Sequence, residues 1–185
     1  MSRTNPYKKK RRSASKTLLI FGEGLGEEMF LKHLRKLYAF NNDIAITIKK
    51  GKGGDARNII IDASKIIGAY DRKIVVLDND KSAEEMKIAR QEAKKKKIEL
   101  IENTPCLEYL LLLILEEQTD KTNSKLCKQI FESKYIDRKK RNEPDEYNKL
   151  FTKKLLDKKR LKINELDNLL LIMEGVKSKR KHETK

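Results

Sequence analysis

Short apolar runs alternate with amphipathic stretches between residues 17 and 118. The runs are rich in Ile, Leu and Val and have the length of buried strands, whereas the stretches between them repeat apolar residues at the spacing of helices. The pattern predicts strands over 17–22, 44–48, 73–78 and 98–101, with helices over 26–39, starting near Asp55, and over 82–97.

Several side chains have predicted positions in these helices. The second helix is expected to place five apolar residues inward: Ile59, Ile60, Ala63, Ile66 and Ile67. Ser82, followed three residues later by Glu85, forms a capping box that marks the start of the third helix. His33 is expected on the surface of the first helix.

A strand, a helix and a strand in succession, repeated three times, favour a parallel sheet with right-handed crossovers. The predicted fold is therefore α/β, with a Rossmann-like parallel sheet of about four strands flanked by helices. Thr104 and Pro105 are expected to be the N-cap and first residue of a further helix. That helix is apolar nearly all round at Leu110–Leu115, so it must be buried.

Beyond residue 118 no strand pattern is found. Helices are expected near 123–134, 146–158 and 163–174, with the polar stretch Asp137–Asp145 between the first two. The predicted organisation has four parts: a basic disordered arm (1–16), an α/β domain (17–118), a helical extension packed on it (119–177) and a basic tail (178–185).

The chain carries a net charge of +16, most of it at the two ends. Residues 1–16 hold seven basic and no acidic side chains, and residues 177–185 hold five basic and one acidic. Such arms attract nucleic acid without reading its sequence, because each cation that neutralises a phosphate releases counterions. The simpler interpretation, that a Lys-rich composition only keeps the protein soluble, stays open.

The sequence also indicates a compartment. Cys106 and Cys127 match no zinc-binding spacing, and a chain of 185 residues needs no disulfide to stabilise its core. The basic N-terminal residues are not followed by the apolar segment of a signal peptide. The longest apolar run, Leu110–Leu115, is far shorter than the roughly 20 residues of a membrane span. We therefore expect a cytoplasmic protein without membrane contact; its oligomeric state is not indicated.

Carboxylates end two of the predicted strands. Glu23 follows the first strand, and Asp78 and Asp80 end the third. Since the carboxyl ends of parallel strands meet at the edge where open α/β sheets bind ligands, these side chains are expected close together. Carboxylate oxygens are suitable ligands for Mg²⁺ or Mn²⁺. The structural alternative is a helix-entry role for Glu23 and a turn at the two Asp residues.

A basic, glycine-containing segment follows the second strand. Its cations are Lys49, Lys50, Lys52 and Arg57, and its three glycines would let backbone amides approach a phosphate closely. The spacing fits neither the Walker A motif nor the dinucleotide fingerprint. We therefore interpret it as a nucleic-acid-binding loop, with a flexible basic turn as the alternative.

Glu108 is an acid in an otherwise apolar helix that begins at the same sheet edge. A carboxylate there must be paired, hydrogen-bonded or part of the site. Cys106 is expected to be a small core residue rather than a nucleophile, because no histidine lies in a suggestive context.

The acids resemble the pattern of the Toprim fold, which has a Glu after strand one and an Asp-x-Asp after strand three and occurs in topoisomerases, primases and small nucleases. More narrowly, residues 17–118 resemble the RloB family of Toprim-like proteins from bacterial defence loci. The matching segments are Glu23-Gly24, Asp78-Asn79-Asp80 and Thr104-Pro105-Cys106-Leu107-Glu108, then Leu110–Leu113; Thr104 and Leu107 stand where the family usually has Asn and Phe.

This resemblance implies a Mg²⁺-dependent Toprim endonuclease acting on RNA or DNA, the toxic effector of an anti-phage defence system, with an ATPase that senses phage as a possible partner. Glu23, Asp78 and Asp80 would be direct or water-mediated metal ligands. Glu23 is also a candidate general acid or base, and Glu108 would complete the catalytic residues.

Two other classes of function are considered. One is a noncatalytic nucleic-acid-binding or assembly subunit that uses a Toprim-like scaffold. The other is a phospho-receiver domain, against which the single acid after strand one, the second Asp at position 80 and the basic ends argue. Topoisomerase and complete primase activities are not expected of one small domain.

Overall fold

The computed structural model describes residues 14–39, 43–119 and 123–176. Its sheet contains four parallel strands in the order β2-β1-β3-β4. The strands are β1 (Lys16–Gly22), β2 (Ile44–Lys50), β3 (Arg72–Asp78) and β4 (Glu99–Asn103). Three helices connect them: α1 (Leu25–Tyr38), α2 (Ala56–Lys65) and α3 (Ala83–Lys96). The predicted α/β fold with a Rossmann-like sheet is confirmed.

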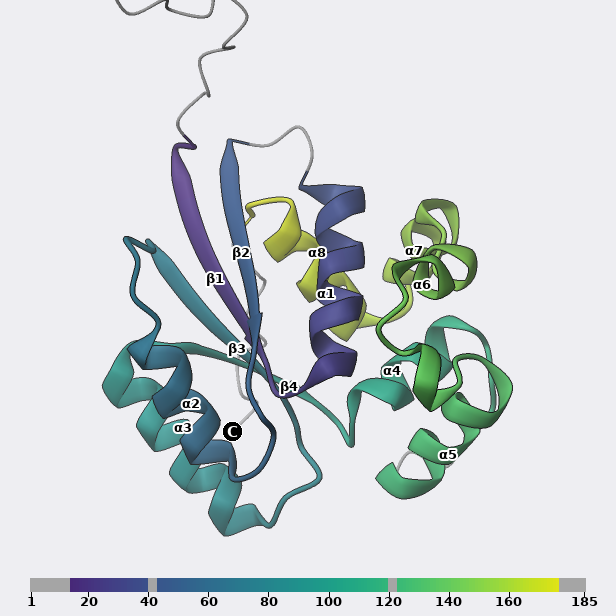
Figure 1. The fold of residues 1–185 in the computed structure, drawn as a ribbon, viewed down its shortest axis with the longest axis horizontal. Helices are drawn as coiled ribbons and strands as arrows, with labels where there is room; N and C mark the ends of the chain where they lie inside the picture. The colour runs from purple at the N-terminus through teal and green to yellow at the C-terminus, as the bar shows by residue number, and fades with distance from the viewer. Residues whose placement is uncertain (1–13, 40–42, 120–122, 177–185) are drawn as a thin grey trace, which may run out of the picture.

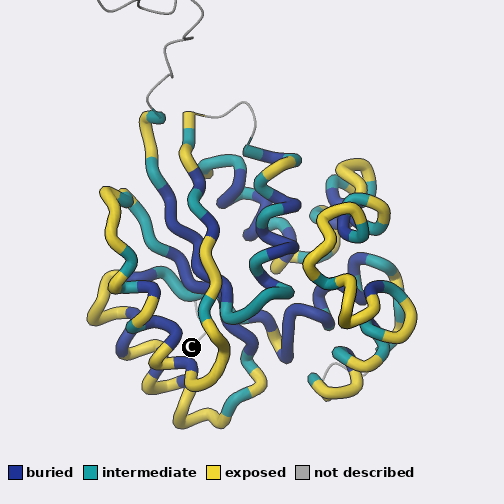
Figure 2. The backbone as a smooth tube through the Cα atoms, viewed as in Figure 1, coloured by how far each residue is buried: buried dark blue, intermediate teal, exposed yellow. Residues whose placement is uncertain are grey.

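Helices cover both faces of the sheet (Figure 1). Val75 and Leu77 of β3 pack with α2 and α3 on one face. Ile74 and Val76, which alternate with them, pack on the other face in the larger core with α1 and the C-terminal helices. Figure 2 shows the two central strands, β1 and β3, as largely buried, whereas the edge strand β2 is partly exposed. Burial on both faces explains why the sequences of β1 and β3 are continuous apolar runs.

The C-terminal half is helical. It contains α4 (Leu107–Ile114), α5 (Ser124–Lys134), a 3₁₀ turn η1 (Arg138–Lys140), α6 (Pro144–Leu150), α7 (Lys153–Arg160) and α8 (Asn164–Met173). These helices share the larger core with α1: the rings of Phe30 and Phe151 meet edge to face with centroids 5.3 Å apart. The Tyr38 hydroxyl donates to Asp157 Oδ1 at 2.8 Å.

Four local predictions are wrong. Ile67 is 96% exposed, because α2 already ends at Lys65. The N-cap of α4 is Cys106 rather than Thr104, because Asn103 still belongs to β4 and Cys106 keeps an extended backbone. The helix predicted over 146–158 is two helices, since Phe151 turns into the core and Thr152 caps α7 by accepting from the Leu155 amide at 3.3 Å.

The fourth correction concerns His33, which was expected on the surface. It is only 6% exposed, because α6 and the residue after it cover this part of α1. The two ring nitrogens lie 3.1 Å from Asn148 Oδ1 and 2.6 Å from the Phe151 carbonyl oxygen. His33 therefore joins the helical extension to the sheet domain.

Two further points concern the ends of the chain and membranes. The basic tail (178–185) and residues 1–13 of the predicted disordered arm fall outside the described residues. The predicted boundary of the arm at residue 16 is wrong, because β1 begins at Lys16 and the Ser15 amide donates to the Asp43 carbonyl at 3.0 Å. Within the described ranges no helix combines the length and apolar character needed to cross a bilayer.

Candidate functional site

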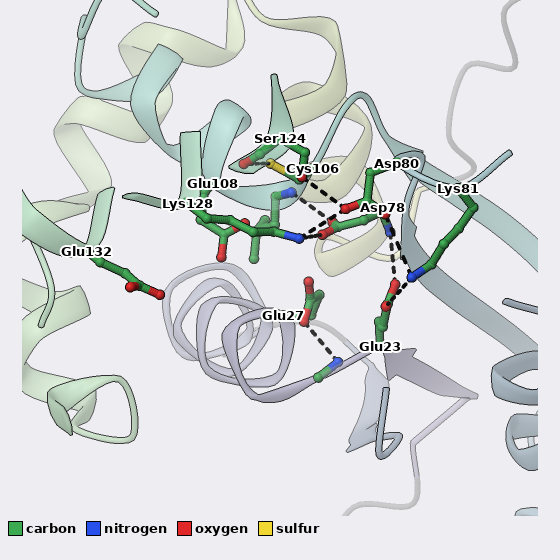
Figure 3. Close-up of polar contacts among 12 residues, drawn as sticks. Glu23, Glu27, Asp78, Asp80, Lys81, Cys106, Glu108, Ser124, Lys128 and Glu132 are labelled. Atoms are coloured by element: carbon green, nitrogen blue, oxygen red, sulfur yellow. Dashed lines mark hydrogen bonds and ion pairs between the residues drawn. The ribbon is translucent and has the colours of Figure 1, made fainter. Parts of the chain in front are cut away.

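The carboxyl ends of β1 and β3 bring Glu23 and Asp78 together, as the sequence predicts. The two strands are parallel neighbours, with Gly22 in register with Val76. Glu23 Oε2 accepts a hydrogen bond from the Asp78 backbone amide at 3.3 Å (Figure 3). Burial and the nearby charge of Asp78 raise the pKa of Glu23 above its usual value.

Asp78 is held by two elements from the C-terminal half. Its Oδ1 accepts from the Leu107 amide in the first turn of α4 at 2.8 Å, and its Oδ2 lies 3.1 Å from Lys128 Nζ of α5. The residue is 4% exposed. Burial raises the pKa of Asp78, although Lys128 and the Leu107 amide act in the opposite direction.

Asp80 is bound by three side chains. Its Oδ2 accepts from Ser124 Oγ at 2.9 Å and lies 3.1 Å from Lys128 Nζ, while its Oδ1 is 3.8 Å from Lys81 Nζ. Partial burial alone would raise its pKa, but Lys128 and the two hydrogen bonds outweigh burial, so the pKa of Asp80 is lowered. Lys81 also reaches Glu23 Oε1 at 3.6 Å, so lysines link all three predicted carboxylates.

Glu27 is a further carboxylate at this edge, and the sequence analysis missed it. Its Oε2 accepts from the Gly24 amide at 2.9 Å across the first turn of α1. A Cβ at Gly22 would lie 2.6 Å from Glu27 Cβ, so only glycine lets the end of β1 pass this close to α1. Burial and the charge of Asp78 raise the pKa of Glu27 to about 7.

Glu108 lines the same cavity as Asp78 and Glu27. Its Oε1 is 3.7 Å from the Arg141 guanidinium, whereas its buried Oε2 has no hydrogen-bond partner among the described residues. Burial, followed by the charge of Asp78, raises the pKa of Glu108. A buried carboxylate oxygen without a partner is costly unless it meets a ligand or holds a proton.

These groups line an open cavity of about 380 Å³. Glu23, Asp78 and Glu108 lie on the side of the sheet edge, and Lys128, Arg138 and Arg141 come from α5 and the segment after it. Residues 24–26, Glu27, Gly53 and Glu132 complete the lining. The cavity thus has acidic and basic lining residues, which is an arrangement suited to a phosphate and a cation together.

The side chains at this edge fit a divalent cation in donor type but not in arrangement. The donors are carboxylate oxygens, which Mg²⁺ and Mn²⁺ favour, and the unpartnered Oε2 of Glu108 is available nearby. In the part of the chain that the structure describes, however, no three His, Cys, Asp or Glu side chains converge as a metal site. The ammonium groups of Lys81 and Lys128 lie between the carboxylates instead. A metal cation would therefore have to displace these lysines, although the carboxylate oxygens are donors of the right type.

The predicted nucleic-acid-binding loop lies beside this edge. The Gly51 amide donates to the Gly22 carbonyl at 2.9 Å and the Gly53 amide to the Glu23 carbonyl at 3.1 Å. Lys49, Lys50 and Lys52 are exposed to solvent. Arg57 is turned toward α3, with its Nε 3.5 Å from Glu92 Oε2.

Cys106 is a fully buried core residue, as predicted. Burial raises the pKa of its thiol to about 12, which leaves it protonated at neutral pH and inert as a nucleophile.

The sequence analysis missed Glu27, Lys128 and Ser124, for different reasons. Glu27 had a usable signal, because it follows the Glu23-Gly24 pair in the first turn of a helix. Lys128 and Ser124 had none: they belong to a helix whose place against the sheet depends on long-range packing of Cys127 and Phe131.

Comparison with known proteins gives one family. No curated protein and no solved structure matches the chain significantly. The model of the family described as RloB-like protein matches residues 18–183. Since this match extends over nearly all of the sequence, the chain belongs to the RloB-like family.

Proposed function

We propose that this chain is a metal-dependent nuclease that hydrolyses phosphodiester bonds in RNA or DNA. The observation that carries the proposal is the meeting of Glu23 and Asp78, through the 3.3 Å hydrogen bond, at the carboxyl edge of a parallel sheet. Asp80 pairs with Lys81 and Lys128, the lysines that also contact Glu23 and Asp78. The order of the three acids is that of the Toprim nucleases which the sequence resembles.

Each group has a definite role in this proposal. Glu23, Asp78 and Asp80 would hold Mg²⁺ or Mn²⁺, which supplies polarisation of the phosphoryl group and orientation of the attacking water. Glu27, with a pKa of about 7, can accept and return a proton near neutral pH. Glu108 lines the same cavity, and its Oε2 has no hydrogen-bond partner in the described part of the chain.

The biological part of the proposal rests on the resemblance to defence proteins. We propose that the nuclease acts in the cytoplasm as the toxic effector of an anti-phage system, together with an ATPase that senses the phage. Expression of the wild type would then be toxic to cells, and Asp78→Asn would remove the toxicity. Sequencing of RNA and DNA ends from the intoxicated cells would identify the substrate.

The biochemical test uses labelled RNA and DNA with Mg²⁺ or Mn²⁺. Cleavage by the wild type, lost in Asp78→Asn and after chelation, supports the proposal. Cleavage that persists in both would exclude it.

A noncatalytic nucleic-acid-binding subunit is the second candidate. It is favoured by one observation: Lys81 and Lys128 already form ion pairs with the three acids at the sheet edge. It predicts salt-sensitive binding that Asp78→Asn leaves intact, and no cleavage with or without partners.

A further inference from the structure

The lining of the cavity divides by element. The sheet edge and the helix starts beside it supply carboxylates, among them Glu23, Asp78 and Glu108. The segment from α5 through Arg141, called the basic wall below, supplies Lys128, Arg138 and Arg141, with Glu132 as its acid. In Figure 3 the Lys128 side chain reaches from the wall to the two Asp residues.

The predicted loop after β2 contributes little to the cavity. Gly53 is its lining residue, whereas none of Lys49, Lys50 and Lys52 lines the space. Arg57 is engaged with Glu92 of α3. Lys81, which follows β3, contacts Glu23 and Asp80 but does not line the cavity, so the cations of the cavity lining come from the helical extension.

The three cations of the wall differ in how they are engaged. Lys128 lies between Asp78 and Asp80, and Arg141 pairs with both Glu132 and Glu108. Arg138 has neither an ion pair nor a side-chain hydrogen bond within the described ranges, although it lines an acid-rich cavity. A guanidinium without a protein partner beside such a space is available to an anionic group of a ligand.

Lys128 can be released without unfolding its helix. Cys127 and Phe131 of α5 are buried in the larger core, which fixes the helix, whereas the Lys128 side chain is 37% exposed. A ligand that neutralises Asp78 and Asp80 would remove its partners, and the ammonium would then face the cavity. Lys128 and Arg138 would offer two cations to adjacent phosphates.

We propose that the basic wall is the phosphate-binding side of the cavity: Lys128 and Arg138 bind backbone phosphates of a nucleic-acid strand and present one of them to Glu23 and Asp78. That the ligand is a nucleic-acid strand rests on the proposed function, whereas phosphate binding by the basic wall does not depend on it. The helical extension is thereby half of the substrate site, in addition to its packing against the sheet domain.

The test compares each wall cation with a neighbour on the same element. Lys128→Met is matched by Lys125→Met in α5, and Arg138→Gln by Lys139→Gln in η1; both control residues are exposed and lie outside the cavity lining. The full chain is titrated with a labelled single-stranded oligonucleotide in Ca²⁺ at several salt concentrations. Circular dichroism and thermal melting confirm that each variant folds.

Each wall variant is expected to weaken binding about fivefold and to reduce the salt slope by about 0.7, the value for one phosphate contact on a single strand. The controls should change binding by less than about twofold. Equal losses in wall and control variants, or no loss in either, would overturn the assignment. Displacement of the strand by a mononucleotide at equal phosphate concentration would also overturn it, in favour of a free nucleotide ligand.

The outcomes separate this inference from the proposed function. If Asp78→Asn abolishes cleavage while the wall variants bind like the wild type, the phosphate-binding role of the basic wall is contradicted and the proposed nuclease activity is supported. If the wall variants lose binding and neither the wild type nor any variant cleaves, the phosphate-binding role of the wall is supported and the proposed nuclease activity is contradicted.

Discussion

Glu23 and Asp78 are joined by a hydrogen bond from the Asp78 amide to the Glu23 carboxylate, with 3.3 Å between Oε2 and N. The bond connects the ends of two neighbouring strands that are 55 residues apart in the chain. It holds one acid against the backbone of the other, so the distance between them is set by the sheet and not by flexible side chains alone. Their proximity is the basis of the proposed chemistry.

Lys128 occupies the space between Asp78 and Asp80 that a cation would need. Lys128→Met should therefore bind Mn²⁺ about tenfold more tightly than the wild type. The variant removes the competing ammonium group but keeps an uncharged side chain of similar length. Isothermal titration calorimetry measures the affinity. Lys125→Met should match the wild type, and an unchanged or weaker affinity in Lys128→Met would contradict the competition.

Glu27 should make stability depend on pH. Its pKa is raised from 4.5 to about 7 in the folded protein, so the folded state keeps a proton that the unfolded chain loses above about pH 4.5. This carboxyl therefore lowers stability progressively between pH 4.5 and 7 and by a constant amount above pH 7. Glu27→Gln keeps an acceptor for the Gly24 amide and removes the penalty.

The expected gain of Glu27→Gln over the wild type is near zero at pH 4 and on the order of 3 kcal/mol at pH 8. Urea unfolding at several pH values measures it. Glu28→Gln, which removes an ion pair with Lys32 on the same helix, serves as the control. A gain that is the same at pH 4 and pH 8 would show that Glu27 does not behave as described.

Phe151 should be one of the main stabilising contacts between the extension and the sheet domain. It is fully buried and packs edge to face on Phe30 of α1. Phe151→Ala should lower the free energy of unfolding by about 3–5 kcal/mol. Leu161→Ala, at a side chain that is 85% exposed, should change it by less than about 0.5 kcal/mol.

Denaturant titrations followed by circular dichroism would compare the two variants. If the extension and the sheet form one cooperative unit, a single transition moves to lower denaturant in Phe151→Ala. A small effect, or loss of only part of the helical signal, would mean that the two parts unfold independently.

The sheet and its acidic edge could be predicted because their signals are local. A run such as Ile74–Leu77 is apolar at every position, so its sequence alone indicates a strand that is buried on both faces. The acid at its end lies at the carboxyl edge of the sheet, where the ends of parallel strands lie side by side. Residues 18–22 and Glu23 carry the same kind of signal. The order of the strands was not predicted: right-handed crossovers limit the possible orders, but they do not select the observed order β2-β1-β3-β4.

The failures have a common cause in long-range packing. His33 looks like a surface residue beside Lys32, and only α6, more than 100 residues later, buries it. The break between α6 and α7 at Phe151 is likewise set by the core that this ring enters. Lys128 lies in an ordinary amphipathic helix, and its role follows from where α5 meets the sheet edge.

The most direct measurement is cleavage of labelled single-stranded RNA and DNA in Mn²⁺ by the wild type, Asp78→Asn and Asp62→Asn. Asp62 is an exposed acid on α2 that pairs with Lys65, so its variant controls for loss of one negative charge. The wild type and Asp62→Asn should cleave, and Asp78→Asn should be slower by at least about 100-fold, a larger loss than substitutions around a metal ligand usually cause. Equal cleavage by all three proteins would contradict a catalytic site at Glu23 and Asp78.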